Sequence, residues 1–365
     1  MTKNYEVYDR LTKVNGEKYD TGLKLDKNSE SISIDNYGTF LNDVADLPSN
    51  EELDQEFSDS LKKNVSNEDS HFKREYIDKF HHIDFRYKDI FDKESKDYNP
   101  NGEFNNNYMF LAMNCAVRPN LERSEWKMFH DVDDKHDSHM LNLRLMINDI
   151  DAKGCYVTDA IKQCISSNSS YILKEFFVKK PGLSFNNSDA SDEERAEQLL
   201  KWDKQAVISK AVSKKRSSRR EEENDENYKL TESEKNSVIH SIETKLENKD
   251  IKLDHINMKH ALADVKEKKD IYDKSVRVLI HELNAIKPKQ IIVFGTTKNN
   301  PDTNSNTGLV KMISESKQFD ECENGAELRK LLQNAVPVTH YGNQHYPSTR
   351  EFYMTVRNEI KDKLE

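Results

Sequence analysis

The sequence predicts an α/β protein with a three-layer α/β/α fold and a short, mostly parallel central sheet. Short apolar runs such as Tyr108–Asn114 and Gln290–Gly295 are typical of buried parallel strands. Amphipathic helices separate these runs, and Met258–Ile286 shows the clearest helical periodicity. The carboxyl ends of parallel strands meet at one edge of a sheet, where open α/β sheets bind their ligands. Four predicted strand ends should therefore converge on one cleft, namely Asn114, Thr158-Asp159, Gly295 and His340.

The composition indicates a packed domain that carries long solvated segments. The chain has 365 residues, of which 35% are hydrophobic and 33% charged, and its mean hydropathy is -0.93. These values are too polar for one compact body. The sequence contains no run of about 18 apolar residues and no signal-peptide core, so we expect a cytoplasmic protein without a membrane span. The net charge of -10 opposes nucleic-acid wrapping by the whole surface but permits a local basic groove.

The cysteines predict buried free thiols, because they are scattered and form no Cys-x-x-Cys pair. A disulfide framework or a zinc knuckle is therefore not expected, and neither is a cofactor. The four residues are Cys115, Cys155, Cys164 and Cys322.

Residues 1–70 are polar and predict an N-terminal extension. Within it, Ile32–Tyr37 is predicted as a short strand, and Thr39–Val44 and Glu51–Val65 as amphipathic helices. The aromatic-rich segment His71–Tyr98 favours core packing on the main domain over a base-stacking platform.

Residues 71–180 predict the first part of the α/β domain. The strand that ends at Asn114 is followed by a predicted helix over Met140–Ile150. A second strand, Gly154–Asp159, then ends in Thr-Asp.

Residues 181–252 predict a charged insertion, either an exposed helical arm or a disordered segment. Pro181-Gly182 breaks the chain, and a basic block is later followed by the acidic block 221–226. The basic block suits contacts with nucleic-acid phosphates; the alternative is a solvated helix face neutralised by the acidic block. The insertion also suits a protein partner. The candidate phosphate contacts are Lys214, Lys215, Arg216, Arg219 and Arg220.

Residues 253–365 predict the second part of the α/β domain. The long helix ends before Pro288, and a buried strand and a glycine follow, as in a βαβ unit. The remaining predicted elements are a helix at Gly325–Asn334, a strand at Val336–His340 and a closing helix at Arg350–Leu364.

The order of these motifs resembles the uracil-DNA glycosylase superfamily. Ala112-Met-Asn-Cys-Ala116 is similar to the family's first motif at the Asn, and Thr158-Asp159 occupies the place of its base-reading Thr-Asn. The segment Leu279–Gly295 is like the family's stretch Glu-Leu-x-x-Ile-x-Pro-x-x-Ile-x-x-x-Gly. His340–Ser348 looks like a lengthened His-Pro-Ser motif. The resemblance covers about residues 75–180 and 255–365.

This resemblance implies recognition of a base in nucleic acid, with hydrolysis of its N-glycosidic bond as the associated activity. Asn114 would orient the attacking water, and His340 would donate to the departing base or hold a phosphate. Phe129 would stack on the base. The other implied base or ligand contacts are His130, Asp131, Thr158, Asp159, Gly295, Asn343, His345 and Ser348.

Two departures from the family pattern bear on the ligand and the reaction. The first motif lacks the Asp that activates water and the Pro-Gly that approaches the sugar. Asp159 stands where the family usually has Asn. An ionised carboxylate only accepts hydrogen bonds, so it would repel the uracil oxygens and suit guanine, cytosine or adenine, which carry amino groups.

Three other function classes are open from the sequence. A sensor, defence or regulatory protein would hold a nucleotide or modified base in the same cleft without cleaving it. An interaction protein with an inert core would use the charged insertion. A metal-dependent hydrolase would use the imidazoles and carboxylates of one short segment, although metal ligands usually come from separate elements. That segment contains His130, Asp131, Asp133, Asp134, His136, Asp137 and His139.

Overall fold

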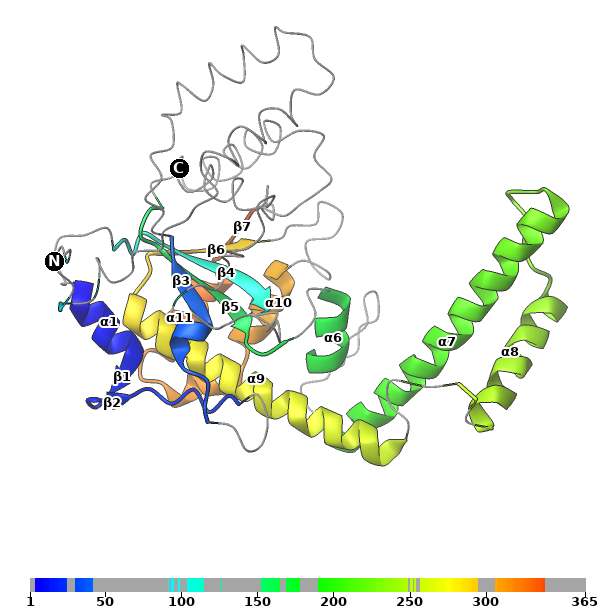
Figure 1. Cartoon of the computed structure of the whole chain (residues 1–365), viewed down its shortest axis with the longest axis horizontal. Coiled ribbons are helices and arrows are strands. Elements are labelled where there is room, and N and C mark those ends of the chain that lie inside the picture. Colours follow the sequence, from blue (N-terminus) through cyan, green and yellow to red (C-terminus); the bar gives the residue numbers. More distant parts are fainter. Residues whose placement is uncertain are drawn as a thin grey trace, which may run out of the picture. The chain divides into compact units, whose positions relative to one another are not determined.

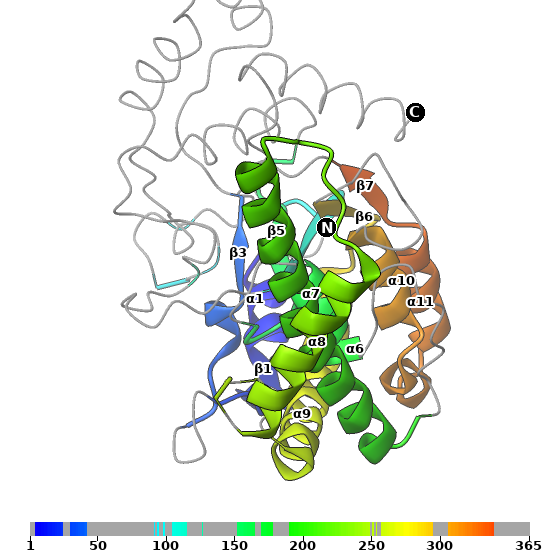
Figure 2. The same cartoon turned by 90° about the vertical axis from the view of Figure 1, so that its right-hand side faces the viewer.

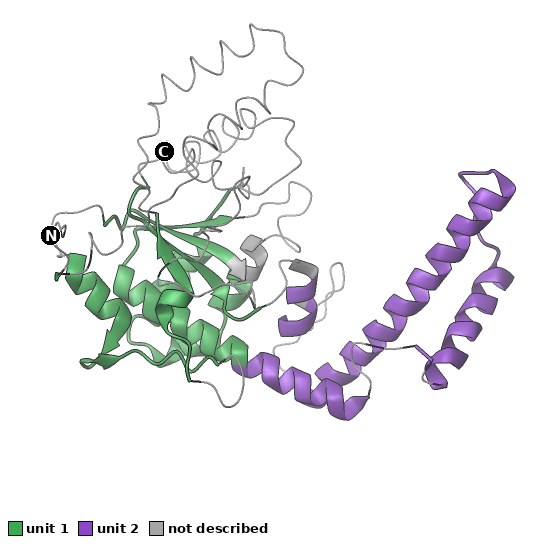
Figure 3. Ribbon diagram, in the orientation of Figure 1, with its two compact units in different colours: residues 1–169, 271–365 green, residues 170–270 purple. Residues whose placement is uncertain are grey.

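The structure is a computed structural model, and it divides the chain into two compact units (Figure 3). Unit 1 comprises residues 1–169 and 271–365, and unit 2 comprises residues 170–270. The residues that the structure describes are 4–24, 30–41, 91, 93–94, 98, 104–114, 126, 152–164, 169–177, 190–248, 250–251, 253, 257–294 and 306–338.

Unit 1 contains a five-stranded sheet in the order β3-β5-β4-β6-β7 (Figure 1). The four strands from β5 to β7 run parallel, and β3 pairs antiparallel with β5 at one edge. The predicted α/β fold with a mostly parallel sheet is thereby confirmed. The strands are β3 (Gly38–Phe40), β4 (Tyr108–Asn114), β5 (Tyr156–Ile161), β6 (Gln290–Phe294) and β7 (Val336–Val338).

The central strands are buried on both faces, which explains why they are apolar without strict alternation. All six residues of β5 are buried, as are the last four of β6. Phe110 of β4 pairs in register with Ile292 and stacks on Phe294 at 5.5 Å between ring centroids. These contacts hold β4 and β6 together in the middle of the sheet.

The described helices of unit 1 lie on one side of the sheet (Figures 1 and 2). The long helix α9 (Met258–Ile286), which matches the prediction, contributes its second half to this layer. Asn324, at the start of α11, donates to Asn284 of α9 at 2.6 Å. The connections from β5 to β6 and from β6 to β7 run in the same direction across the sheet, so the right-handed rule puts the second half of α9, α10 and α11 on the same face. The other helices are α1 (Asn4–Thr12), α10 (Asn306–Ser314) and α11 (Gly325–Gln333), with a 3-10 turn at Lys317–Glu321.

The N-terminal segment differs from its prediction. Instead of a strand over Ile32–Tyr37, the chain forms a 3-10 turn at Ile34–Asn36. The helix predicted over Thr39–Val44 is also wrong in its described part, where β3 instead pairs with β5. Local periodicity in so short a segment is overridden by the open edge of β5, which supplies backbone partners.

A small hairpin precedes this segment, and Tyr19, directly after it, stacks on His281 of α9. Strands β1 (Lys13–Val14) and β2 (Glu17–Lys18) pair antiparallel around Asn15 and Gly16, whose φ angles are 53° and 84°. Two successive positive φ angles are those of a type I′ turn, which Asn-Gly favours.

Unit 2 is helical, so the helical alternative for the insertion is confirmed in its described residues. It contains α6 (Ser169–Phe177), α7 (Asp192–Glu223), α8 (Glu232–Glu247) and the first half of α9. Capping boxes at Ser191 and Thr231 start α7 and α8. A hydrophobic core between α7 and the first half of α9 consists of Ala196, Leu199, Trp202, Ala261 and Val265.

The remaining predicted helices, at Glu51–Val65, Met140–Ile150 and Arg350–Leu364, lie outside the described residues. Of the helices that the structure describes, none combines the length and apolar character that a membrane crossing requires.

Candidate functional site

The centre of the parallel sheet contains a point at which the strand order reverses. The chain passes from β4 outward to β5, then returns past β4 to β6 and continues to β7. The reversal lies between β4 and β6, and ligands of open α/β sheets bind outside the carboxyl ends of the strands at such a point. Asn114 is the last residue of β4, and β6 ends at Phe294, immediately before Gly295. The topology thus brings the ends of β4 and β6, with Asn114 and the position before Gly295, to this edge.

Strand β5 lies two residues further along the chain than the sequence predicts, at Tyr156–Ile161 instead of Gly154–Asp159. It continues to Ile161, so Thr158 and Asp159 lie within the strand rather than at its end. The pairing register aligns Asp159 with Ala112 and Ile161 with Asn114. Asp159 therefore lies two residues deeper in the sheet than the position of Asn114.

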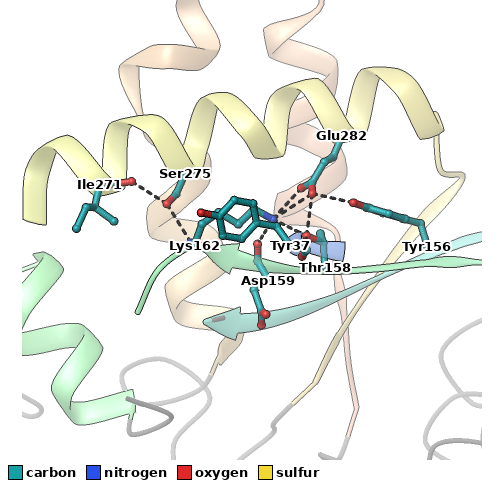
Figure 4. Close-up of polar contacts among 8 residues, drawn as sticks. All are labelled: Tyr37, Tyr156, Thr158, Asp159, Lys162, Ile271, Ser275 and Glu282. Carbon is teal, nitrogen blue, oxygen red and sulfur yellow. Dashed lines mark hydrogen bonds and ion pairs between the residues drawn. The ribbon is translucent and has the colours of Figure 1, made fainter. Parts of the chain in front are cut away.

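Asp159 and Thr158 occupy opposite faces of the sheet, as consecutive strand residues must. The side chain of Asp159 points away from α9 (Figure 4), and the residue is only 2% exposed. By strand alternation, Ala112 and Asn114 hold positions on this same face. Asp159 is also the only carboxylate within the five strands of the sheet. Of the candidates, Asn114 and Asp159 thus share one face on neighbouring strands.

Thr158 belongs instead to a polar network beneath α9 (Figure 4). Its hydroxyl lies 2.9 Å from the Tyr37 carbonyl and 2.9 Å from Glu282 Oε1, and it accepts a hydrogen bond from Lys162 Nζ. Because all of these groups are buried, the hydroxyl has a structural role between the sheet and the helix.

The centre of this network is a buried ion pair. Lys162 Nζ lies 3.0 Å from Glu282 Oε2, and both side chains are 0% exposed. The three protons of the ammonium group have acceptors in Thr158, the Asp159 carbonyl and Glu282. Charges removed from water need this degree of hydrogen bonding to offset the loss of hydration.

Tyr156 completes the network. Its hydroxyl donates to Glu282 Oε1 at 3.0 Å. Burial, followed by the negative charge of Glu282, raises the pKa of Tyr156 well above its ordinary value. The phenol is therefore a proton donor to Glu282 at neutral pH. A Cβ on Gly38 would lie 2.0 Å from the Tyr156 hydroxyl oxygen, so the glycine leaves the space that the phenol occupies.

Sequence reasoning missed Lys162, Glu282 and Tyr156 as an interacting set. Glu282 is the first residue of the glycosylase-like stretch, which was the available signal. Lys162 and Tyr156 lie on either side of Thr158 with the two-residue periodicity of one strand face. The sequence pattern that indicates such a pair is an acidic residue on a buried helix, here Glu282, together with a basic residue directly after a buried strand, here Lys162.

The other candidates divide into two groups. The basic candidates of the insertion all lie on α7. Another group falls outside the described residues, together with the rest of the His130–His139 cluster: Phe129, His130, Asp131, Gly295, His340, Asn343, His345 and Ser348. Within the described ranges, three or more His, Cys, Asp or Glu side chains do not gather as a metal site would require. The three described cysteines, Cys155, Cys164 and Cys322, are free thiols.

Comparisons with protein-family models, with curated proteins and with solved structures find no match to this chain.

Proposed function

We propose that the protein recognises a base in nucleic acid at the carboxyl edge of its sheet and hydrolyses the N-glycosidic bond of that base. The observation that carries this proposal is the reversal of strand order between β4 and β6, because it places Asn114 where α/β sheets bind ligands. The motif resemblance gives this position a role, which is to orient water against the sugar.

Asp159 supports a preference among bases. It supplies the only carboxylate of the five strands and shares the face of the Asn114 position. An ionised carboxylate accepts hydrogen bonds from exocyclic amino groups and repels carbonyl oxygens. The proposed ligand is therefore cytosine, adenine or guanine, or a modified form of one of them, in preference to uracil.

A panel of single-stranded and duplex oligonucleotides tests this proposal, each containing one uracil, hypoxanthine, modified cytosine or mismatch. We expect one substrate to give an alkali-labile abasic site, and the Asn114→Ala variant to lose this cleavage. The matched control is Asn106→Ala, which removes the same amide before the amino end of β4. Cleavage that survives in the Asn114 variant would remove Asn114 from the mechanism.

A noncatalytic binder is the second candidate, and the first motif favours it. Ala112–Ala116 contains no carboxylate to activate water. General-base assistance typically contributes about 10²–10⁴-fold to such a reaction, so its absence has a large effect. Binding of one oligonucleotide without an abasic product, weakened by Asn114→Ala, would identify this function. The absence of both binding and cleavage would favour an interaction module.

A further inference from the structure

The middle of α7 carries an unusual segregation of charge. We call residues 204–220 the basic stretch; it contains seven lysines and arginines and no acidic residue. The whole chain, by contrast, has a net charge of -10. The seven cations are Lys204, Lys210, Lys214, Lys215, Arg216, Arg219 and Arg220.

The acidic block after the basic stretch neutralises only one of these cations within the described residues. Arg219 Nη1 lies 2.9 Å from Glu222 Oε2, and Arg219 Nε lies 3.1 Å from Glu234 Oε1. The other six cations make no ion pair with the acids that the structure describes. A solvated face balanced by its neighbouring acids therefore does not describe the basic stretch.

The helix presents these cations in rows. Lys210 and Lys214 are four residues apart, as are Arg216 and Arg220, so each pair lies one above the other on the helix. At 100° per residue, the two rows flank the side that carries Val207, Ile208, Ala211 and Val212, which are partly buried. Lys204, Lys210, Lys214 and Arg216 are exposed. The basic stretch spans about 24 Å at the helical rise.

We propose that the basic stretch of α7 binds the phosphate backbone of nucleic acid, whatever its bases. A polyanion with phosphates at regular intervals can contact cations spread along about 24 Å of helix on two flanks. The five acids of residues 221–226 repel phosphates, which ends the contact at Arg220. This inference goes beyond base recognition at the sheet and does not depend on it.

A lipid surface fits the basic stretch less well than nucleic acid does. Helices that bind membranes insert large apolar side chains into the interface. Among the described residues, Val14 is the only large hydrophobic side chain that is exposed, and it belongs to unit 1. The basic stretch thus offers charge without an apolar anchor.

The test is the salt dependence of binding by the full-length protein to a duplex of ordinary bases, about 30 base pairs long. The variant replaces Lys204, Lys210, Lys214 and Arg216 with Gln, which preserves helix propensity. The slope of log K against log salt is negative, and each lost phosphate contact makes it shallower by about 0.9. Four lost contacts should therefore reduce its magnitude by between about three and four. At low salt we expect the affinity to fall on the order of 30-fold or more.

The matched control variant replaces four exposed lysines of unit 1 with Gln, namely Lys18, Lys24, Lys311 and Lys330. It has the same net charge as the first variant, and we expect it to keep the wild-type slope within about one unit. Equal losses in both variants would reduce the effect to net charge and overturn the proposal. An unchanged slope in the α7 variant would also overturn it.

Two further measurements distinguish phosphate binding by α7 from binding to other anionic surfaces and from base recognition at the sheet. Phosphatidylcholine–phosphatidylserine vesicles and polyglutamate, offered at the same salt, should bind more weakly than the duplex; equal or tighter binding of either would overturn the proposal. Asn114→Ala should leave the salt slope unchanged, because Asn114 belongs to the sheet. Failure of base recognition with an intact slope would leave phosphate binding by α7 in place.

Discussion

The ammonium group of Lys162 lies 3.0 Å from the Glu282 carboxylate, and neither side chain is exposed to solvent. This ion pair joins the end of β5 to the middle of the second half of α9 (Figure 4). Replacing a buried pair by apolar residues is often neutral, whereas removing one partner leaves an uncompensated charge. The main role of the pair is therefore to fix which turn of α9 lies over β5, and its net contribution to stability is the smaller effect.

Removing one charge of this pair should be strongly destabilising. We expect Lys162→Met to lower the free energy of unfolding by about 3–5 kcal/mol, because Glu282 then remains buried without its cation. Urea denaturation near pH 7 measures the change. The surface pair Lys13–Asp9 provides the control, since Lys13 is 49% exposed; Lys13→Met should cost less than about 1 kcal/mol.

The double variant Lys162→Met with Glu282→Leu separates the pair from its surroundings. We expect it to recover much of the loss, because it leaves no unpaired charge. Tyr156 and Thr158 each lose the Glu282 acceptor, so recovery should stay incomplete by about 1–3 kcal/mol. Additive losses in the double variant would contradict a coupled pair.

Gly38 should tolerate no side chain while Tyr156 is present. A Cβ at Gly38 would approach the Tyr156 hydroxyl oxygen to 2.0 Å, so Gly38→Ala must displace the phenol from Glu282. We expect a cost of about 2–4 kcal/mol in urea denaturation. In the Tyr156→Leu background the same substitution should cost less than half as much. An equal cost in both backgrounds would place the strain elsewhere.

His281 should make folding stability depend on pH. Its Nε2 lies 2.8 Å from the Leu11 carbonyl, its ring stacks on Tyr19 at 3.7 Å, and burial lowers its pKa. Because the folded pKa is depressed, the unfolded chain binds the proton first as the pH falls below about 6.5. Stability contributed by neutral His281 is thus present above that pH and decreases below it.

The measurement is urea denaturation at several pH values between about 7.5 and 5.5, where His281→Gln should flatten the slope. One proton contributes at most about 1.4 kcal/mol per pH unit. His240→Gln is the control, since His240 is exposed on α8. A slope that changes equally in both variants would exclude His281 as its cause.

Glu234 should hold the turn between α7 and α8. It accepts from the Thr231 backbone amide at 2.9 Å and from Arg219 Nε at 3.1 Å, and it contacts the Tyr228 hydroxyl. Loss of a capping box typically costs about 1 kcal/mol, so Glu234→Ala should lower amide-exchange protection at the start of α8 about fivefold. Glu232→Ala, which removes an exposed acid that pairs with Lys235 and with no other residue that the structure describes, should leave protection unchanged. A similar loss in both variants would contradict this role.

The long elements could be predicted because local signals and tertiary packing agree in them. Met258–Ile286 has an apolar stripe and a terminating Pro288, and β6 is an uninterrupted apolar run before a glycine. Short segments failed where a distant partner decides the conformation. Gly38–Phe40 is a strand because β5 has an open edge there, which the segment itself does not encode.

The candidate site was predictable only in part for the same reason. Asn114 ends its strand as predicted, because the apolar run stops there. Strand β5 does not end at Asp159, as predicted, but continues to Ile161. In the sequence, the charge of Lys162 suggests an exposed loop at this point. That lysine is buried only because Glu282, 120 residues away in sequence, lies opposite it. Long-range charge pairing of this kind leaves no local periodicity.

The most direct test of the central claim is competition for a labelled single-stranded oligonucleotide by unlabelled strands that differ in one base. For the wild-type protein we predict that cytosine, adenine or guanine competes best and uracil worst, because the ionised carboxylate of Asp159 would only accept hydrogen bonds. Asp159→Asn should raise uracil in that order, since an amide both donates and accepts. Uracil binding to the wild-type protein as tightly as any other base, or an order that Asp159→Asn leaves unchanged, would contradict base recognition by this edge of the sheet.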